Sequence, residues 1–266
     1  MHGTIAWSVR EAGGLRGLAP SAPPAGGAES CRICRGWAGP RFEVCFSCSV
    51  TLSRVSHPCP RVAVMALCRG GSPLHELLRD YKEGRPRTRE VLSARVAALA
   101  GAFLWREGPA MAPEGWDAVV TVPSTAGRPG PHPLEEALGR VEWLAPQVVG
   151  AGVTYTGPGG CGHRRAQEDG FGVDPALVGL RVLVVDDTWA SGARVQSTAS
   201  ALVRAGATVA AVAVLGRYVT PMAGTGSEKW WREQVGAGRA AGSAEPALGP
   251  LRRRGTARRS GPGQPS

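Results

Sequence analysis

The clearest pattern in the chain is an apolar run that ends in two acids and is followed by a helical period. Residues 182–185 are four consecutive apolar residues, which favours a buried strand covered on both faces. Asp186 and Asp187 follow, and small residues then lead into a helix. The apolar positions of that helix share one face: Val195, Ala199, Leu202 and Val203. Gly206 ends the helix, and residues 208–215 are almost wholly apolar. The pattern predicts a strand–loop–helix–strand unit with a right-handed crossover.

Similar patterns elsewhere predict more elements of both kinds. We expect further strands at 62–68, 117–122 and 153–156. We expect further helices around Leu74, Leu77 and Leu78, from an N-cap at Thr88 through Leu92, Val96, Leu99 and Phe103, and over residues 133–149. Strands that alternate with helices indicate an α/β fold with a mostly parallel sheet flanked by helices.

Composition divides the chain into four parts. Residues 1–29 are rich in Gly, Ala and Pro, and we expect them to be disordered. Residues 30–60 carry most of the cysteines and form a small zinc-ribbon-like module. Residues 61–220 hold the α/β pattern. Residues 221–266 are predicted to be a mostly disordered basic tail, with no structure beyond about 233, although Trp230 and Trp231 can dock onto the domain.

The net charge of +10 raises the question of a nucleic-acid partner. Of the 31 basic residues, all but Lys82 and Lys229 are Arg. Five of the arginines lie in the C-terminal tail: Arg252, Arg253, Arg254, Arg258 and Arg259. Such a tail can hold nucleic acid through its phosphates. The alternative is a solvated end whose Arg, Gly and Pro reflect overall composition.

No apolar run approaches the length of a membrane span, and the N-terminus lacks the basic start and apolar stretch of a signal peptide. We therefore expect a cytoplasmic protein without a membrane span. In that compartment disulfides are improbable, which bears on the cysteines.

Two matched cysteine pairs point to a metal. Cys31 and Cys34 form one Cys-x-x-Cys pair, and Cys45 and Cys48 form another. Four thiolates in this spacing suit tetrahedral zinc, and a closed site of four ligands holds structure rather than substrate. A redox role for one pair is the alternative.

The remaining cysteines raise three smaller questions. His57 and Cys59 lie close enough in sequence to complicate the ligand set. Cys68 falls in an expected strand and is interpreted as a buried thiol. Cys161 lies in a Gly-rich loop and can be reactive there, although nothing in the sequence requires it.

The twin acids and the residues after them suit a phosphorylated sugar. Acids that end a buried parallel strand lie at the sheet edge where α/β folds bind ligands. They can hold ribose hydroxyls, while small residues and the amides of a helix N-terminus can hold a phosphate. The alternative is that the two acids bind no ligand, since many parallel strands end in Asp without forming a binding site.

Two other loops are candidates for a second phosphate group. Residues 123–128 follow the strand at 117–122, and Arg128 supplies a positive charge at the same sheet edge. The loop at 157–174 carries His163, Arg164 and Arg165 and can close over a polyphosphate. For both loops the alternative is an ordinary solvated surface.

The segment Val182–Arg194 resembles the ribose-5-phosphate loop of type I phosphoribosyltransferases, which bind phosphoribosyl pyrophosphate (PRPP) with Mg²⁺. The resemblance implies that Asp186 and Asp187 bind ribose. It implies a phosphate and PRPP site formed by Thr188, Ser191, Gly192, Ala193 and Arg194. Arg128, Arg164 and Arg165 would face pyrophosphate. Ala190 stands where the family usually has Thr or Asp, and alanine cannot move a proton, so no catalytic residue is assigned.

The order of features over residues 31–217 resembles the ComF family. It comprises the cysteine pairs, the Tyr81-Lys82-x-Gly84 segment, a strand ending in Val122-Pro123, and the twin-acid loop. The Arg-Gly-Phe-Asn-Gln segment common in that family is not present. The resemblance implies a phosphoribosyltransferase-like domain with a four-cysteine zinc element, and some members are tied to DNA uptake.

Three hypotheses follow. The first is an enzyme that transfers phosphoribosyl from Mg-PRPP to a nitrogenous base. The second is a non-catalytic accessory of competence that binds nucleotide, single-stranded DNA or DNA-processing proteins. The third is a stable zinc-containing domain with a vestigial site. The acceptor base is not indicated by the sequence.

Overall fold

The computed structural model of the 266-residue chain describes residues 29–124, 130–157 and 165–242. The expected disordered N-terminal segment and most of the basic tail, with its five arginines, therefore lie outside the described residues. So do Arg128, Cys161, His163 and Arg164.

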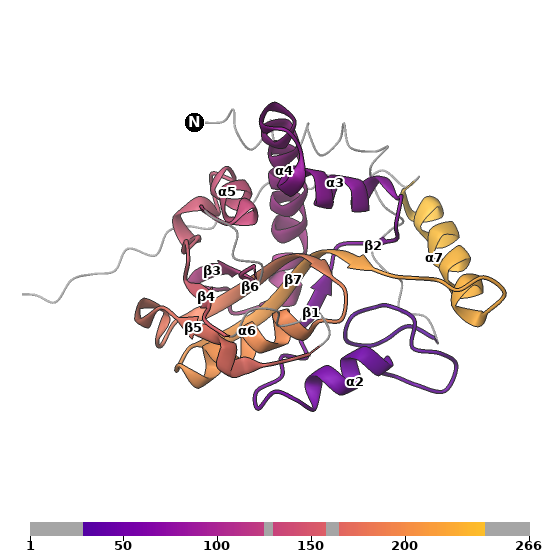
Figure 1. Cartoon of the computed structure of the whole chain (residues 1–266), viewed down its shortest axis with the longest axis horizontal. Coiled ribbons are helices and arrows are strands. Elements are labelled where there is room, and N and C mark those ends of the chain that lie inside the picture. Colours follow the sequence, from indigo (N-terminus) through magenta and orange to yellow (C-terminus); the bar gives the residue numbers. More distant parts are fainter. Residues whose placement is uncertain (1–28, 125–129, 158–164, 243–266) are drawn as a thin grey trace, which may run out of the picture.

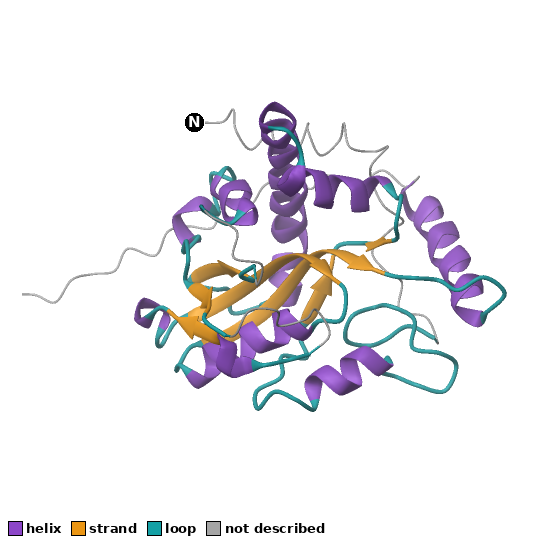
Figure 2. Ribbon diagram, viewed as in Figure 1, coloured by secondary structure: helices purple, strands orange, loops and turns teal. Residues whose placement is uncertain are grey.

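A parallel sheet forms the centre of the protein (Figures 1 and 2). Its strand order is β1 (Val62–Val64), β7 (Thr208–Tyr218), β6 (Arg181–Trp189) and β3 (Ala118–Thr121), and β2 (Leu67–Cys68) also pairs with β7. Val184 of β6 lies between Val120 and Val212 in register. This confirms the predicted α/β architecture with a mostly parallel sheet.

Successive side chains of β6 point alternately to the two faces of the sheet. Leu183 and Val185 pack with α3 (Pro73–Glu83), α4 (Pro86–Met111) and α5 (Pro133–Gly139). Val182 and Val184 pack instead with α6 (Ala193–Arg204) and the cysteine-bearing residues 30–59. Figure 1 shows α3 and α4 on one side of the sheet and α6 with α2 (Phe46–Leu52) on the other. Both faces of the central strands are therefore buried, as a parallel sheet requires.

Smaller elements complete the described chain. Strands β4 (Val153–Tyr155) and β5 (Phe171–Val173) form an antiparallel pair. Short 3₁₀ turns lie at η2 (Ala145–Gln147), η3 (Glu168–Gly170) and η4 (Pro175–Leu177). In the part of the chain that is described, no helix is both long enough and apolar enough to cross a bilayer.

Several predicted boundaries were wrong. The strand expected at 62–68 is broken after Val64 into β1 and β2. The helix expected from an N-cap at Thr88 begins at Pro86 instead, because proline at the first helical position sets the required φ. The helix expected over 133–149 ends at Gly139, and Val148 instead bridges to Val119 beside the sheet. Strands β6 and β7 run further toward their carboxyl ends than their apolar runs indicate.

The largest differences lie in two segments that sequence patterns left without structure. The expected loop at 157–174 contains η3 and β5. The tail contains α7 (Gly226–Gly242), although no structure was expected beyond about 233.

The two tryptophans of α7 dock onto the domain, as proposed from the sequence. Trp230 and Trp231 are buried with Leu67 and Val219. The Trp230 indole also donates a hydrogen bond to Ser30 Oγ at 2.9 Å. These contacts bring α7 against the start of the cysteine module.

Candidate functional site

The twin acids lie at the carboxyl edge of the sheet, where the sequence placed them. They sit within β6 rather than after it, because the strand continues to Trp189. Successive strand side chains point to opposite faces. Asp187 therefore lies on the face covered by α3, and Asp186 on the face covered by α6.

Asp187 is held by the last turn of α3. The Tyr81 hydroxyl donates a hydrogen bond to one carboxylate oxygen. Lys82 Nζ lies 3.0 Å from that oxygen and 3.2 Å from the other. Burial opposes ionisation, but the charge of Lys82 and the Tyr81 hydrogen bond keep the pKa of Asp187 below its ordinary value. Asp187 is therefore an ionised carboxylate with fixed partners.

Asp186 is in the opposite electrostatic situation. Its side chain is 5% exposed, and one of its oxygens accepts a hydrogen bond from the Asp187 amide at 3.0 Å. Burial, and next the charge of Asp187, raise the pKa of Asp186 to about 7. Near neutral pH this carboxyl can carry a proton or face a cation, so two adjacent acids have different chemical roles.

The loop after the acids has the backbone geometry of an anion site. Gly192 has a φ of +83° and immediately precedes α6. A Cβ at this position would overlap the Trp189 indole, so only glycine fits. Ser191 Oγ accepts a hydrogen bond from the Ala193 amide at 3.2 Å. The first amides of a helix have no intrahelical acceptor and can bind an anion.

The other residues of the predicted PRPP site lie at the same edge. Thr188 is half-buried in β6 and pairs in register with Gly216. Arg194 is half-buried in the first turn of α6, and its positive charge acts to lower the pKa of Asp186. The structure thus brings together every residue from Asp186 to Arg194 that the sequence assigned to the site.

Sequence reasoning assigned no role to three residues of this site. Tyr81 and Lys82 were noticed only as part of a family-like segment, which was the available signal. His132 caps α5, and its Nδ1 accepts a hydrogen bond from the Leu134 amide at 3.3 Å. Burial lowers the pKa of His132, while the charges of Asp187 and Lys82 also act on it. A neutral His132 with Nδ1 engaged carries its proton on Nε2 and can donate from there.

The expected lid is fixed at the end that the structure describes. Arg165 is exposed, but Ala166 packs with Ala193. The next residue, Gln167, donates its amide to Ser197 Oγ at 2.8 Å. Glu168 accepts hydrogen bonds from Ser56 and from Ser200 of α6. The proposed pyrophosphate contacts of Arg128 and Arg164 lie outside the described residues.

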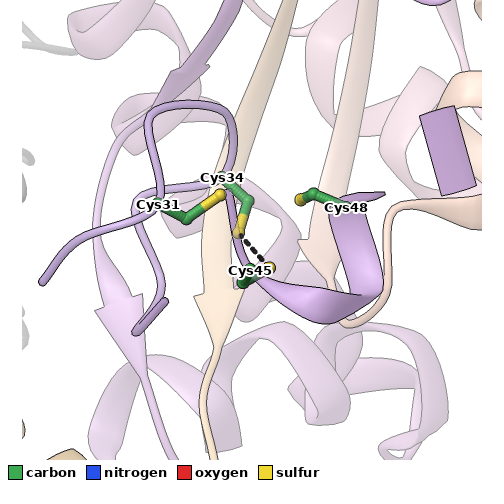
Figure 3. A group of neighbouring side chains, drawn as sticks. All are labelled: Cys31, Cys34, Cys45 and Cys48. Atoms are coloured by element: carbon green, nitrogen blue, oxygen red, sulfur yellow. Dashed lines mark hydrogen bonds between the residues drawn. The ribbon is translucent and has the colours of Figure 1, made fainter. Parts of the chain in front are cut away.

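The four predicted cysteine ligands form one buried group (Figure 3). Their sulfur atoms all lie within 4.8 Å of one another, and the sulfurs of Cys34 and Cys45 are 3.7 Å apart. A tetrahedron with Zn–S bonds of about 2.3 Å has an edge of about 3.8 Å. The group can therefore hold a structural metal ion such as zinc.

Crowding already perturbs these thiols. Hydrogen bonds from neighbouring thiols, that of Cys34 above all, lower the pKa of Cys31, whereas the hydrogen bond with Cys31 raises the pKa of Cys48. Four thiols this close cannot titrate independently, and a divalent cation that replaces their protons removes the conflict.

The other described cysteines lie outside this group. Cys59 is buried and its thiol donates to the Arg61 carbonyl oxygen. Cys68 is buried, as predicted, and burial raises the pKa of its thiol to about 12. Among the residues that the structure describes, His57 and Cys59 are not part of a ligand group.

No protein-family model matches the chain, and no curated protein is similar to it. What the site can do is therefore argued from its own chemistry.

We expect the full-length protein to contain one zinc ion per chain, measured by elemental analysis. Cys48→Ala should lose the metal, and melting of the module should move to lower temperature, because metal binding supplies about 10 kcal/mol to small thiolate sites. Cys59→Ala is the matched control and should keep the metal. Equal metal content in Cys48→Ala and wild type would contradict the four-thiolate site.

We expect Asp186→Asn to stabilise the protein increasingly as pH rises. The folded-state pKa of about 7 lies above the ordinary value of 3.8, so the wild type loses stability as pH rises from about 3.8 to about 7, and Asn removes this loss. The stability gain from Asn should grow by about 1–3 kcal/mol between pH 5 and pH 8. Denaturant unfolding measures it, with the exposed cap variant Asp174→Asn as control. A gain that is the same at both pH values would show that Asp186 ionises normally.

Proposed function

We propose that this chain is a phosphoribosyltransferase-like protein of the ComF type, which binds PRPP or ribose 5-phosphate with Mg²⁺. The observation that supports this most is the continuity of the site. Two buried acids with opposite pKa shifts are followed, within five residues, by a positive-φ glycine and a helix N-terminus. Hydroxyl-binding and phosphate-binding groups are thereby spaced for one phosphorylated pentose.

Each part of the ligand has a matching group. Asp186 and Asp187 would accept hydrogen bonds from the ribose hydroxyls, directly or through Mg²⁺. The Ser191 hydroxyl, the Gly192 amide and the Arg194 guanidinium would hold the 5-phosphate. The Ala193 amide would join them by exchanging its hydrogen bond to Ser191 Oγ for one to the phosphate. Thr188 would border the ribose. When bound, Mg²⁺ would neutralise the negative charge that the acids and phosphates bring together.

In a transfer reaction, the bond between the anomeric carbon and the pyrophosphate oxygen breaks, and a bond from that carbon to a base nitrogen forms. Negative charge develops on the departing pyrophosphate, so donors that face it lower the barrier. Lys82 and the Nε2–H of His132 are candidates among the described residues. Arg128, Arg164 and Arg165 are candidates from the sequence.

Proton transfer is the step with the weakest support. Ala190 occupies the position where related sites carry Thr or Asp, and it has no proton to give or take. His132 Nδ1 is occupied by the Leu134 amide, so this side chain is a donor rather than a base. Ligand binding is therefore better supported than transfer, and the acceptor base stays open.

We expect PRPP to bind the wild-type protein in a magnesium-dependent manner, measured by titration calorimetry. Asp186→Asn should weaken binding about ten- to a hundredfold, the equivalent of one charge-assisted interaction. Gly192→Ala should weaken it too, because the new Cβ displaces the loop. Gly139→Ala, with open space around its Cβ, is the matched control.

Binding that is independent of magnesium and unchanged in Asp186→Asn would contradict the proposed site. If binding has the expected pattern, pyrophosphate release with a panel of nitrogenous bases separates an enzyme from a binding protein.

A second candidate function is an accessory role with single-stranded DNA. One feature of the cysteine module favours it: the side chains of Trp37, Phe42 and Phe46 are exposed at 37%, 63% and 83%. Arg32 and Arg41, also exposed, belong to the same segment. Exposed aromatics beside arginines suit stacked bases and a phosphate backbone.

If this second function operates, retention on single-stranded DNA should fall steeply with salt, as measured by fluorescence anisotropy. Phe46→Ala should weaken binding by about 1–3 kcal/mol, the value of one stacked base. Deleting residues 245–266 tests the basic tail separately. Met222→Ala, also exposed but outside the module, is the control. Affinity that is unaffected by both Phe46→Ala and the deletion would exclude this role.

A further inference from the structure

Arg217 fixes the backbone from which the loop of Ser191 and Gly192, here called the phosphate loop, begins. The side chain extends from the end of β7 and is 8% exposed. Its Nη1 donates to the carbonyl oxygens of Trp189 at 3.1 Å and Ala190 at 2.7 Å, and also to that of Tyr218. Trp189 and Ala190 immediately precede Ser191, so this guanidinium sets where the loop leaves the sheet.

The other edge of the same guanidinium lies against the cysteine module. A Cβ at Gly36 would come within 3.0 Å of both Nε and Nη2 of Arg217. Gly36 closes the turn of the first cysteine pair, where its carbonyl accepts the Cys31 amide at 2.7 Å. The buried Nε has no hydrogen-bond partner among the described residues. Arg217 is thus shared between the metal-binding turn and the phosphate loop.

Other contacts connect the module to the loop and to α6. Thr51 Oγ1 donates to the Ser191 carbonyl oxygen at 3.4 Å, and Val55 packs against Ala193. The Cys59 backbone and the Gln196 side chain exchange two hydrogen bonds of 2.8 Å each. The module therefore contacts both the loop and the helix that follows it.

These contacts depend on the metal for a physical reason. A module of about thirty residues has little core of its own, and its fold comes largely from metal binding. Without the metal, the turn at Gly36 would no longer be held in place against the Arg217 guanidinium. A buried guanidinium that loses the packing around it is more stable when solvated, and Arg217 would then release the carbonyl oxygens of Trp189 and Ala190.

We propose that Arg217 is a positioning residue that couples metal occupancy of the four-cysteine centre to the geometry of the phosphate loop. The identity of the loop ligand rests on the proposed function; the coupling itself does not. Because coupling between two binding sites is reciprocal, a ligand on the loop also raises the affinity of the four-cysteine centre for the metal.

The test uses the full-length zinc-loaded protein and two measurements. Titration calorimetry with Mg-PRPP gives the affinity of the loop, and equilibrium competition for zinc with a chromophoric chelator, with and without Mg-PRPP, gives the affinity of the centre for zinc. Arg217→Lys keeps the charge but cannot contact the turn and two carbonyls at once. Arg181→Lys is the matched control, since Arg181 donates to the Gly115 carbonyl at the opposite end of β6.

We expect Mg-PRPP to raise the zinc affinity of the wild type, and Arg217→Lys to remove this increase. The same variant should weaken PRPP binding about five- to fiftyfold, within the usual range of coupling between sites. Arg181→Lys should change neither. If the wild type binds PRPP and its zinc affinity is unaffected by the ligand, the proposal is wrong, whether or not the variant folds.

A third measurement separates this proposal from the proposed function. Zinc removal from the wild type should speed hydrogen exchange of the amides at 189–195 more than that of β3. If PRPP does not bind the wild type but exchange shows this pattern, the ligand assignment fails and the coupling stands. If chelation leaves exchange at 189–195 unchanged, the coupling is refuted.

Discussion

Two adjacent carboxylates buried at the end of β6 are the constraint that organises the rest of the site. Like charges at this spacing inside a protein cannot both be ionised unless something compensates them. Asp187 is compensated from α3 by Tyr81 and Lys82. Among the described residues, Asp186 is compensated by the amide of Asp187 and by the charges of Arg194 and Lys82, but burial and the charge of Asp187 outweigh them and its pKa rises. Asp187 therefore stabilises the packing of α3 on the sheet. Asp186 is costly to ionise unless a cation lies beside it.

Much of the fold could be predicted because its signals are local. The apolar runs at 182–185 and 208–215 are long enough to identify buried parallel strands, and the Cys-x-x-Cys spacing carries its chemistry within four residues. Strand ends were missed because Asp186, Asp187 and Thr188 are polar residues that resemble a loop. They remain in the strand because β7 pairs with them. Sequence periodicity detects apolar residues, whereas here both burial and strand pairing continue through polar ones.

What could not be predicted depends on contacts between distant parts of the chain. Lys82 and Asp187 are 105 residues apart, and nothing near either residue indicates the pairing. Trp230 bonds to Ser30 across 200 residues, so the ordering of α7 cannot be seen in its own composition. His132 was missed because only the fold brings it close enough to Asp187 for their charges to interact. These residues join elements that lie far apart in the sequence.

The four-cysteine centre lies where it can affect the loop of Ser191 and Gly192 through packing. A site closed by four thiolates has no coordination position for a substrate, so its influence has to pass through packing. Here the packing is directed: the module covers the face of the sheet that carries Asp186 and α6, and it touches the loop through Thr51 and Arg217. A metal site on the other face would meet α3 and α4 instead and would have no contact with that loop. Under the proposed function, the position of the cysteine centre behind the loop would make a structural ion relevant to ligand binding.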